Sequence, residues 1–513
     1  MTLQEVLERT AWRVGSKTFL YCDDEGITYE AAVERSRKMA GALASLGVRK
    51  GDRVGFHSVN SVDFALAMYG CWNLGAIAAL IDPRNGPTLD YYVNDADPRV
   101  LLFSRGLAGQ VERKRKEMKG VRRFVCFDGP GKGVRGAVSW RQLVRASKPV
   151  RKDAKDTDPC HLSWTSGSTG LPKGAVLAHE PTATATSCIA ERLHLRQDEA
   201  TLGPTGLSSS YHLVANLLPG VARGCTVGVM SVFDQTEAWK IIRKRKVSVF
   251  VANPLLLTDL YNEWRDKKLN KGTLRITVSG GGPVPPDLKR VYQEKMKVPL
   301  VESFGQSELG GFVALGDPEP YSRKHFSAIG RPLSDKEVII GDENDKELPI
   351  GQVGEILIRR GFMWGYWRRD AATRKTLKNG WLHTGDVGRM DEDGFVFLMA
   401  RKSEQIRWGK KIVYPRAVEE ALYFNPAVQY SALIPVRDRK MGEIPKAIVS
   451  LYPGKNTPEK ALRETVRKRL GAGEVPPVFE VLDEMPMTVT GKINKTALRE
   501  RERERERERK LKK

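Results

Sequence analysis

The chain has 513 residues, of which 41% are hydrophobic and 29% are charged, and its formal net charge is +23. This length predicts more than one domain, and the hydrophobic fraction is sufficient for sizeable cores, which argues against wholesale disorder. We find no uninterrupted apolar run long enough to cross a bilayer and no secretory signal at the N-terminus, so we expect a cytoplasmic protein.

The positive charge is distributed along the chain. The last fifteen residues hold nine basic and five acidic side chains and contribute +4, which leaves +19 for the remainder. A basic surface attracts polyanions such as nucleic acids, acidic lipids and phosphate-rich cofactors. The sequence has no nucleic-acid-binding motif, so we expect no specific nucleic-acid partner. Six cysteines lie far apart without a C-x-x-C pair, which predicts reduced thiols.

About the first 400 residues alternate short β-branched runs with amphipathic segments, which is typical of βα units and parallel sheets. Thr28 is expected to cap a helix that ends at Gly47, because apolar residues between them recur at helical spacing. The elements predicted after it are a strand at 53–57, a helix at 61–74, strands at 76–81 and 247–251, a helix ending at 264, a strand at 274–278, a helix from 286 and a strand at 298–303.

From about residue 330 the pattern changes to short strands separated by glycine turns, which predicts a small β-rich subdomain. A compact α+β segment follows, so we place a domain boundary at 401–404. The tail from Arg499 to Lys513 is nearly pure Arg–Glu alternation, and we expect a frayed helix or a disordered extension. The elements predicted in these segments are strands at 336–340, 354–359 and 394–399, a helix at 415–423, strands at 428–434 and 446–451, and a helix at 459–470.

The segment 163–174 reads S-W-T-S-G-S-T-G-L-P-K-G and predicts a phosphate-binding loop. Glycines let the backbone approach an anion, hydroxyl and N–H groups donate hydrogen bonds to it, and Lys173 adds a positive charge. The loop is not of the Walker A type, because the glycine-to-lysine spacing differs and Gly174 stands where that motif needs Ser or Thr. The residues assigned to phosphate binding are Thr165, Ser166, Gly167, Ser168, Thr169, Gly170 and Lys173.

Four further motifs follow along the chain. Residues 279–283 read S-G-G-G-P, and glycine there allows a flat base to lie against the backbone; residues 302–308 read E-S-F-G-Q-S-E. Residues 381–386 read W-L-H-T-G-D, ending in an acid that is a strong acceptor for paired hydroxyls. Residues 486–493 read P-M-T-V-T-G-K-I and supply a lysine. No cluster has metal-ligand spacing, so no metal beyond one accompanying a nucleotide is indicated.

In this order the motifs resemble those of the adenylate-forming superfamily, which includes acyl- and aryl-CoA synthetases, non-ribosomal peptide synthetase adenylation domains and firefly luciferase. The resemblance spans roughly residues 28–500 and is greatest to AMP-forming acyl-CoA synthetases. It implies an α/β fold in which a large N-terminal domain of βα-built sheets plus a small β-rich subdomain precedes a small mobile α+β C-terminal domain. The implied domains are 1–400 for AMP binding, 401–498 with the catalytic lysine, and 499–513 as a charged tail.

The resemblance also implies an ATP-dependent carboxylic acid–CoA ligase. ATP and Mg²⁺ would convert the acid into acyl-AMP with release of pyrophosphate, and coenzyme A would then accept the acyl group as a thioester. Two alternatives stay open: transfer to the phosphopantetheine of a carrier protein, and a non-catalytic nucleotide-binding homologue. A homodimer stays open as well, and fatty, aryl and alicyclic acids are all candidate substrates.

The family motifs imply roles for individual residues. Lys492 and Glu308 are implied to be catalytic, as is His212, which best matches the residue that closes the acyl pocket. Glu308 and Thr169 are implied to hold magnesium. In the family the aromatic ring of the second motif packs on adenine, and the later Asp and Arg bind the ribose. The further ATP-site residues implied are Gly281, Gly282, Pro283, Ser303, Phe304, Gly305, Gln306, Ser307, Asp386 and Arg401.

Three positions depart from the family pattern. The segment 203–212 does not align uniquely with the family's P-x-x-H stretch, Ser403 stands at a hinge that is usually Asp or Lys, and Lys410 stands where a second glycine is common. Lys410 follows Gly409 in a loop that lines the CoA tunnel in the family, where a lysine either blocks the tunnel or pairs with a CoA phosphate. The acyl-pocket residues implied are His212, Asn216, Gly280, Gly281 and Gly310.

Overall fold

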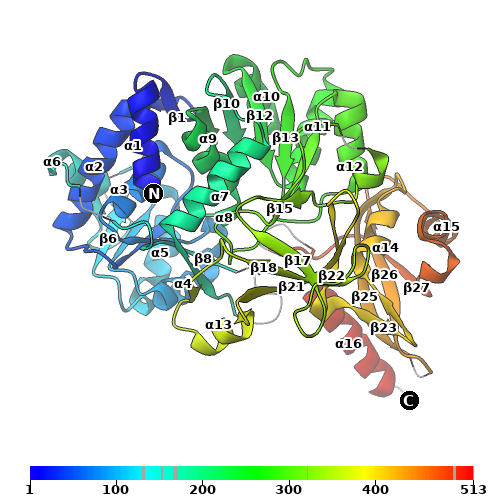
Figure 1. Cartoon of the computed structure of the whole chain (residues 1–513). Coiled ribbons are helices and arrows are strands. Elements are labelled where there is room, and N and C mark those ends of the chain that lie inside the picture. The colour runs from blue at the N-terminus through cyan, green and yellow to red at the C-terminus, as the bar shows by residue number, and fades with distance from the viewer. Residues whose placement is uncertain are drawn as a thin grey trace.

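The computed structural model describes residues 1–129, 133–151, 154–165, 171–320, 322–438, 440–488 and 493–511. Six residues assigned from the sequence lie outside these ranges: Ser166, Gly167, Ser168, Thr169, Gly170 and Lys492. Four sheets organise the described chain, three in the N-terminal part and one near the C-terminus (Figure 1). The prediction of an α/β fold with a large N-terminal and a small C-terminal domain is confirmed.

The first sheet has eight strands in the order β19-β9-β8-β4-β3-β5-β6-β7. The strands from β8 to β7 pair in parallel, and β9 and β19 add antiparallel strands at one edge. Its central strands are continuous apolar runs because both faces are covered. The strands are β3 (Arg53–His57), β4 (Ile77–Leu80), β5 (Val100–Phe103), β6 (Arg123–Cys126), β7 (Val138–Ser139), β8 (Pro159–Trp164), β9 (Gly174–Ala178) and β19 (Gly365–Tyr366).

The second sheet has nine strands in the order β16-β15-β14-β13-β12-β10-β11-β1-β2. The strands from β14 to β1 pair in parallel, while β2, β15 and β16 close the edges in antiparallel pairing. The strands are β1 (Thr18–Cys22), β2 (Glu25–Thr28), β10 (Ala200–Gly203), β11 (Thr226–Val229), β12 (Val247–Ala252), β13 (Ile276–Ser279), β14 (Leu300–Phe304), β15 (Ala314–Leu315) and β16 (Arg331–Pro332).

Helices join and cover these two sheets. Every residue of α3 is buried, because its core cluster includes side chains from strands of both sheets. Thr28 caps α2 by accepting a hydrogen bond from the Ala31 N–H, as its sequence position predicts. The helices of this region are α1 (Leu3–Val14), α2 (Tyr29–Ser45), α3 (Val62–Asn73), α4 (Leu89–Ala96), α5 (Ala108–Lys114), α6 (Trp140–Ala146), α7 (His179–Arg192), α8 (Ser210–His212), α9 (Leu218–Arg223), α10 (Gln235–Lys244), α11 (Pro254–Asp266) and α12 (Pro286–Val291).

A small third sheet follows, with the order β17-β18-β21-β20 and β22 paired to β21, and α13 (Asp370–Thr376) lies beside it. The fourth sheet belongs to the C-terminal domain, which lies at the right of Figure 1. Their strands are β17 (Glu337–Gly341), β18 (Gly354–Arg359), β20 (Leu377–Lys378), β21 (Trp381–Met390) and β22 (Val396–Arg401), then β23 (Ile406–Trp408), β24 (Lys411–Val413), β25 (Val428–Asp438), β26 (Gly442–Leu451) and β27 (Val478–Leu482).

The C-terminal domain also carries α14 (Pro415–Leu422), α15 (Glu459–Leu470) and α16 (Lys495–Leu511). We expected a frayed helix or a disordered extension after Arg499, and the described part of this tail is helical, since α16 continues to Leu511. Arg501 and Arg505 of this helix each donate a hydrogen bond of 2.9 Å to Glu480 on β27. These contacts with β27 stabilise the helix. The Arg–Glu alternation within the helix adds little stability by itself, because attractive i,i+3 pairs and repulsive i,i+4 pairs nearly cancel.

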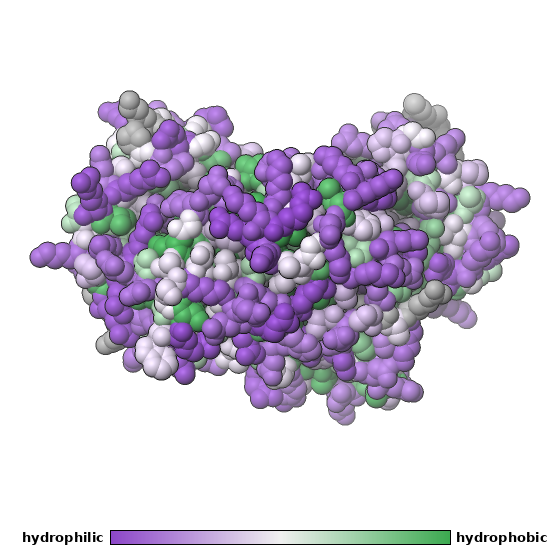
Figure 2. All heavy atoms as spheres, turned by 90° about the horizontal axis from the view of Figure 1, so that it is seen from above, coloured by the Kyte–Doolittle hydropathy of each residue, from purple (hydrophilic) through white to green (hydrophobic). Residues whose placement is uncertain are grey.

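The cysteines are separate from one another and the outer surface is mainly polar. None of the six cysteines forms a disulfide, and five of them are buried. No helix in the described part of the chain is both long enough and apolar enough to cross a membrane. Figure 2 shows a face covered mostly by hydrophilic residues, on which hydrophobic residues form only small separate patches.

Three buried histidines make stability depend on pH. Burial lowers the pKa of His161 to about 3, of His179 to about 4 and of His212 to about 3. In the unfolded chain a histidine titrates at about 6.5. Below that pH the unfolded state therefore binds protons that the folded state does not, so acidification favours unfolding.

We predict that lowering the pH from about 7.5 to about 5.5 reduces the free energy of unfolding by about 1.4 kcal/mol for each of these histidines. Urea unfolding at both pH values measures the loss. His161→Leu should make the loss smaller by that amount, whereas His194→Gln at an exposed position should leave it unchanged. An identical loss in His161→Leu and the unmodified protein would contradict the assignment.

Candidate active site

The phosphate-loop motif connects two adjacent antiparallel strands, β8 and β9. Its ends are joined by two hydrogen bonds, from the Thr165 N–H to the Lys173 carbonyl (3.0 Å) and from the Lys173 N–H to the Thr165 hydroxyl (3.3 Å). Trp164, the last residue of β8, donates its indole N–H to Asp95 at 3.0 Å. The base of the loop is therefore held in one geometry, although its central residues lie outside the described chain.

Asp386 lies on β21 with its carboxylate buried, since only 2% of the residue is exposed. One carboxylate oxygen accepts a hydrogen bond of 2.6 Å from Gln306, and the other lies 3.0 Å from Nε of Arg401. Gln306 and Arg401 also donate to the carbonyl oxygen of Thr384, at 2.9 and 3.1 Å. Asp386 and Arg401 are direct partners in the β21–β22 ladder, so the sheet register itself sets this pair.

A second group of contacts links the phosphate loop to the 302–308 motif. Tyr366 of β19 donates a hydrogen bond of 2.6 Å from its hydroxyl to Glu308, and the Lys173 ammonium lies 4.4 Å from the centre of the Tyr366 ring. Burial and the Glu308 carboxylate raise the pKa of Tyr366, so its hydroxyl stays protonated. Ser307 donates to the carbonyl of Trp164 at 3.1 Å. A cation and a carboxylate thus meet around one ring.

The glycine turn after β13 lies against Tyr211. A side chain at Gly280 would come within 2.3 Å of the Ser303 hydroxyl and 2.7 Å of the Tyr211 ring, so packing requires glycine there. Gly281 has a φ of +76°, which favours glycine, and at Gly282 an added Cβ would meet nothing within 4 Å. Pro283 follows with its side chain exposed. The turn therefore leaves open space beside its backbone.

His212 and Asn216 form a buried pair beside Gly203. His212 Nε2 lies 2.9 Å from the Asn216 amide, which also donates to the Gly228 carbonyl at 3.0 Å. Gly203 makes room for both, because a Cβ there would approach the His212 ring within 2.6 Å. Asn216 lies in a π-helical segment, Leu213–Leu217, a distortion that is frequent at functional sites. With 0% exposure, His212 faces the protein interior here, while Tyr211 faces the glycine turn.

The remaining residues assigned from the sequence lie in several different parts of the fold. Gly310 lets the chain approach the first turn of α7, since a Cβ would lie 3.0 Å from the Thr182 nitrogen. Phe304 is half-buried against the core of the third sheet, and Gly305 packs on the Gly311 carbonyl. Ser403 is exposed in a single 3₁₀ turn after β22. The pocket, adenine and hinge roles of these residues stay predictions.

Gly409 and Lys410 form the tip of the β23–β24 hairpin in the C-terminal domain. Both residues are exposed, and Gly409 has a φ of +61° beside the methyl group of Met441, another residue of that domain. A loop that lines a tunnel would be covered, so this arrangement presents the hairpin tip to solvent instead.

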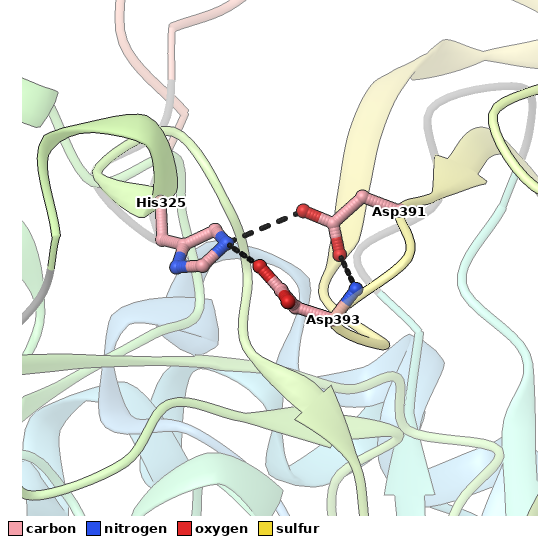
Figure 3. Close-up of side chains that lie close together, drawn as sticks. All are labelled: His325, Asp391 and Asp393. Carbon is pink, nitrogen blue, oxygen red and sulfur yellow. Dashed lines mark hydrogen bonds and ion pairs between the residues drawn. The ribbon is translucent and has the colours of Figure 1, made fainter.

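A cluster of His325, Asp391 and Asp393 lies at the turn between β21 and β22 (Figure 3). Nε2 of His325 is 3.3 Å from a carboxylate oxygen of each aspartate, and Lys324 also pairs with Asp393. The His325 ring stacks on Phe395 at 3.8 Å. These contacts join the 323–325 turn to the β21–β22 hairpin.

The structure thus gathers Lys173, Gln306, Glu308, Asp386 and Arg401 around the junction of three sheets. Their partner Tyr366 was missed from the sequence, because it lies on a two-residue strand with no motif of its own. Tyr211 was also missed, although it directly precedes His212 in a segment already singled out. Lys173 offers a positive charge for a phosphate group, and the Asp386 carboxylate offers acceptors for a vicinal diol.

Comparison with known proteins gives a consistent picture. Residues 7–367 match the family described as AMP-binding enzyme, and residues 417–492 match the AMP-binding enzyme C-terminal domain. The chain is 30% identical over 487 residues to long-chain-fatty-acid–CoA ligase FadD13 of Mycobacterium tuberculosis, covering 93% of each chain. It is also 30% identical over 488 residues to a feruloyl-CoA synthase of an Amycolatopsis species, covering 93% of this chain and 94% of the relative.

The fold of the chain is similar to that of a CoA ligase of known structure. The anthranilate CoA ligase AuaEII in complex with anthranoyl-AMP superimposes with a TM-score of 0.91 at 25% sequence identity, covering 98% of this chain and 97% of the other. Both the N-terminal and the C-terminal parts of the chain therefore have counterparts in that protein.

We predict that Gln306→Glu weakens nucleotide binding by about tenfold at about pH 8, because it places a second carboxylate beside buried Asp386. The two acids would share a proton at lower pH, so affinity relative to the unmodified protein should recover toward about pH 6. Calorimetric titration with ATP at both pH values measures this. Gln352→Glu, the same change at an exposed position, is the control; equal and pH-independent affinities for the two variants would contradict the prediction.

Proposed function

Since the chain belongs to the AMP-binding enzyme family, we propose that the cluster of Lys173, Glu308, Asp386 and Arg401 forms its adenylation site. The protein is an AMP-forming acid–CoA ligase, which activates a carboxylic acid as acyl-AMP and then forms a thioester. The observation that supports the site most strongly is the buried Asp386 carboxylate held between Gln306 and Arg401. Its fixed orientation suits two ribose hydroxyls, because an ionised acceptor strengthens both hydrogen bonds.

In the first half-reaction a carboxylate oxygen of the substrate attacks the α-phosphorus of ATP. The bond between that phosphorus and the bridging oxygen of the β-phosphate breaks, and pyrophosphate leaves. The loop 165–173 is proposed to hold the phosphates through its N–H groups, its hydroxyls and Lys173. Lys492 is proposed to bring a positive charge between the carboxylate and the α-phosphate, where two anions must meet.

Magnesium accompanies ATP in this proposal and would neutralise charge on its phosphates. Glu308 and Thr169 are the proposed ligands, and the hard carboxylate oxygens of Glu308 suit this cation. The hydrogen bond from Tyr366 to Glu308 supports this role, since it orients the carboxylate beside Lys173 without cancelling its charge.

In the second half-reaction the thiol sulfur of coenzyme A attacks the acyl carbon of acyl-AMP. The bond from this carbon to the phosphate oxygen breaks, AMP leaves, and the thiol proton passes to solvent. Gly409 and Lys410 are the proposed tunnel residues, and the C-terminal domain is proposed to reorient about Ser403 between the two steps; the exposed position of the hairpin supports this proposal. Lys410 then meets the phosphate groups of CoA as an ion-pair partner.

An uncharged acyl group is the proposed occupant of the acyl pocket. Tyr211 and Phe312 present aromatic rings 5.9 Å apart beside the Gly280–Gly282 turn, and the neighbouring residues are small or apolar. The CoA ligases to which the chain is similar act, by their names, on long-chain fatty acids, ferulate and anthranilate. Fatty, aryl and alicyclic acids therefore form the panel to examine. The positive net charge also suits an acidic carrier protein as an alternative acceptor.

The decisive experiment is ATP–pyrophosphate exchange over this panel, followed by product analysis with CoA and with carrier proteins. We expect exchange that depends on one acid class and on Mg²⁺, and an acyl-CoA product. No exchange with any acid would overturn the adenylation proposal and revive a nucleotide-binding homologue without catalysis. If an acylated carrier protein forms and no acyl-CoA does, the acceptor is a carrier protein rather than CoA.

The same two measurements on Lys492→Ala test the role proposed for this lysine. Exchange should fall by at least about 100-fold, while thioester formation from supplied acyl-AMP should stay within about threefold, because the positive charge is needed only where two anions meet. Lys460→Ala, an exposed lysine in the same domain, is the matched control. Equal losses in both steps would refute the assigned role.

A further inference from the structure

Four charged side chains meet where the C-terminal domain packs on the N-terminal domain. Lys289 lies on α12 and Glu302 on β14, whereas Arg416 and Glu420 lie on α14, the first helix after the domain boundary. Lys289 Nζ is 2.6 Å from Glu302, Arg416 Nη2 is 3.0 Å from the other oxygen of Glu302, and Arg416 Nε is 2.5 Å from Glu420. The contact of Arg416 with Glu302 therefore joins the two parts of the cluster across the domain boundary.

The cluster is buried and electrically balanced. The side chains of Lys289, Glu302 and Arg416 are 0%, 3% and 8% exposed, and Lys289 also donates to the Ala328 carbonyl at 2.7 Å. Burial lowers the pKa of Lys289, and the Glu302 carboxylate opposes this shift. Two cations face two anions, so no net charge is left in the interior, where an unpaired charge costs several kcal/mol.

Separation of the domains would divide this cluster into two neutral pairs. Lys289 and Glu302 would stay together on the N-terminal domain, and Arg416 and Glu420 would stay together one helical turn apart on α14. Neither domain would expose or bury an uncompensated charge. Breaking the contact is therefore much less costly than breaking an ordinary buried ion pair, in which each partner is left alone.

From this geometry we infer that Lys289, Glu302, Arg416 and Glu420 are positioning residues that form a releasable interdomain tie. The tie holds the C-terminal domain in the orientation seen here and opens without leaving a buried charge unpaired. The functional consequence of the tie rests on the proposed function, in which the two half-reactions use two orientations of this domain.

The tie acts on the strand that leads into the adenylation site. Glu302 is the third residue of β14, and the chain continues through Phe304 to Gln306 and Glu308. Its backbone carbonyl accepts the N–H of Gly316 at 2.9 Å, which fixes β14 against its edge partner. The orientation held by the tie leaves Gly409 and Lys410 exposed, so it is the orientation that serves adenylation rather than thioester formation.

Two double variants test the tie from opposite sides. Lys289→Met with Glu302→Leu removes the N-terminal pair, and Arg416→Gln with Glu420→Gln removes the C-terminal pair, so each variant leaves the other domain neutral. We expect both to slow ATP–pyrophosphate exchange by at least about fivefold while thioester formation from supplied acyl-AMP stays unchanged or rises. Glu237→Gln with Lys240→Gln, an exposed ion pair of α10, is the control and should change neither step.

Trypsin cleavage at the boundary gives a readout besides activity. Arg401 and Lys402 lie between the domains, and looser docking should raise the rate of cleavage there severalfold in both double variants. Equal losses in both half-reactions, or unchanged cleavage, would overturn the tie. If the unmodified protein catalyses neither half-reaction, the proposed function fails instead, and the cleavage rates still decide whether the tie exists.

Discussion

The carboxylate of Asp386 is the constraint on which the rest of this site depends. It lies at the junction of three sheets, where Gln306 reaches it from the end of β14 and Arg401 from the adjacent strand β22. A buried carboxylate is tolerated only with such partners, so the sheets must meet in a defined geometry to satisfy it. The same geometry brings Glu308 and Lys173 to opposite contacts of Tyr366, so the proposed ribose and phosphate contacts belong to one site.

Many helices and strands could be predicted from local sequence patterns. The strand at 53–57, the strand at 354–359 and the helix at 459–470 match the structure residue for residue, because each has a clear apolar period and strong end signals. The tail was different: α16 is stabilised by Glu480 on a distant strand, and no local pattern contains that contact. The site divides in the same way. Its motifs were visible in sequence, whereas Tyr366 and the packing of Tyr211 against Gly280 depend on strands brought together by folding.

A cluster of buried ion pairs contributes to the contact between the two domains. The contact between Arg416 and Glu302 crosses the domain boundary, and each of these residues also has a partner within its own domain. This division suits the proposed function, in which the two half-reactions use two orientations of the C-terminal domain. The exposed hairpin at Gly409 and Lys410 is proposed to act in the second orientation.

A crystal structure with a non-hydrolysable acyl-adenylate analogue tests the central claim most directly. We expect both ribose hydroxyls within hydrogen-bonding distance of Asp386, and the acyl group beside Tyr211 and the Gly280–Gly282 turn. An analogue bound with its ribose away from Asp386, or bound elsewhere on the chain, would contradict it.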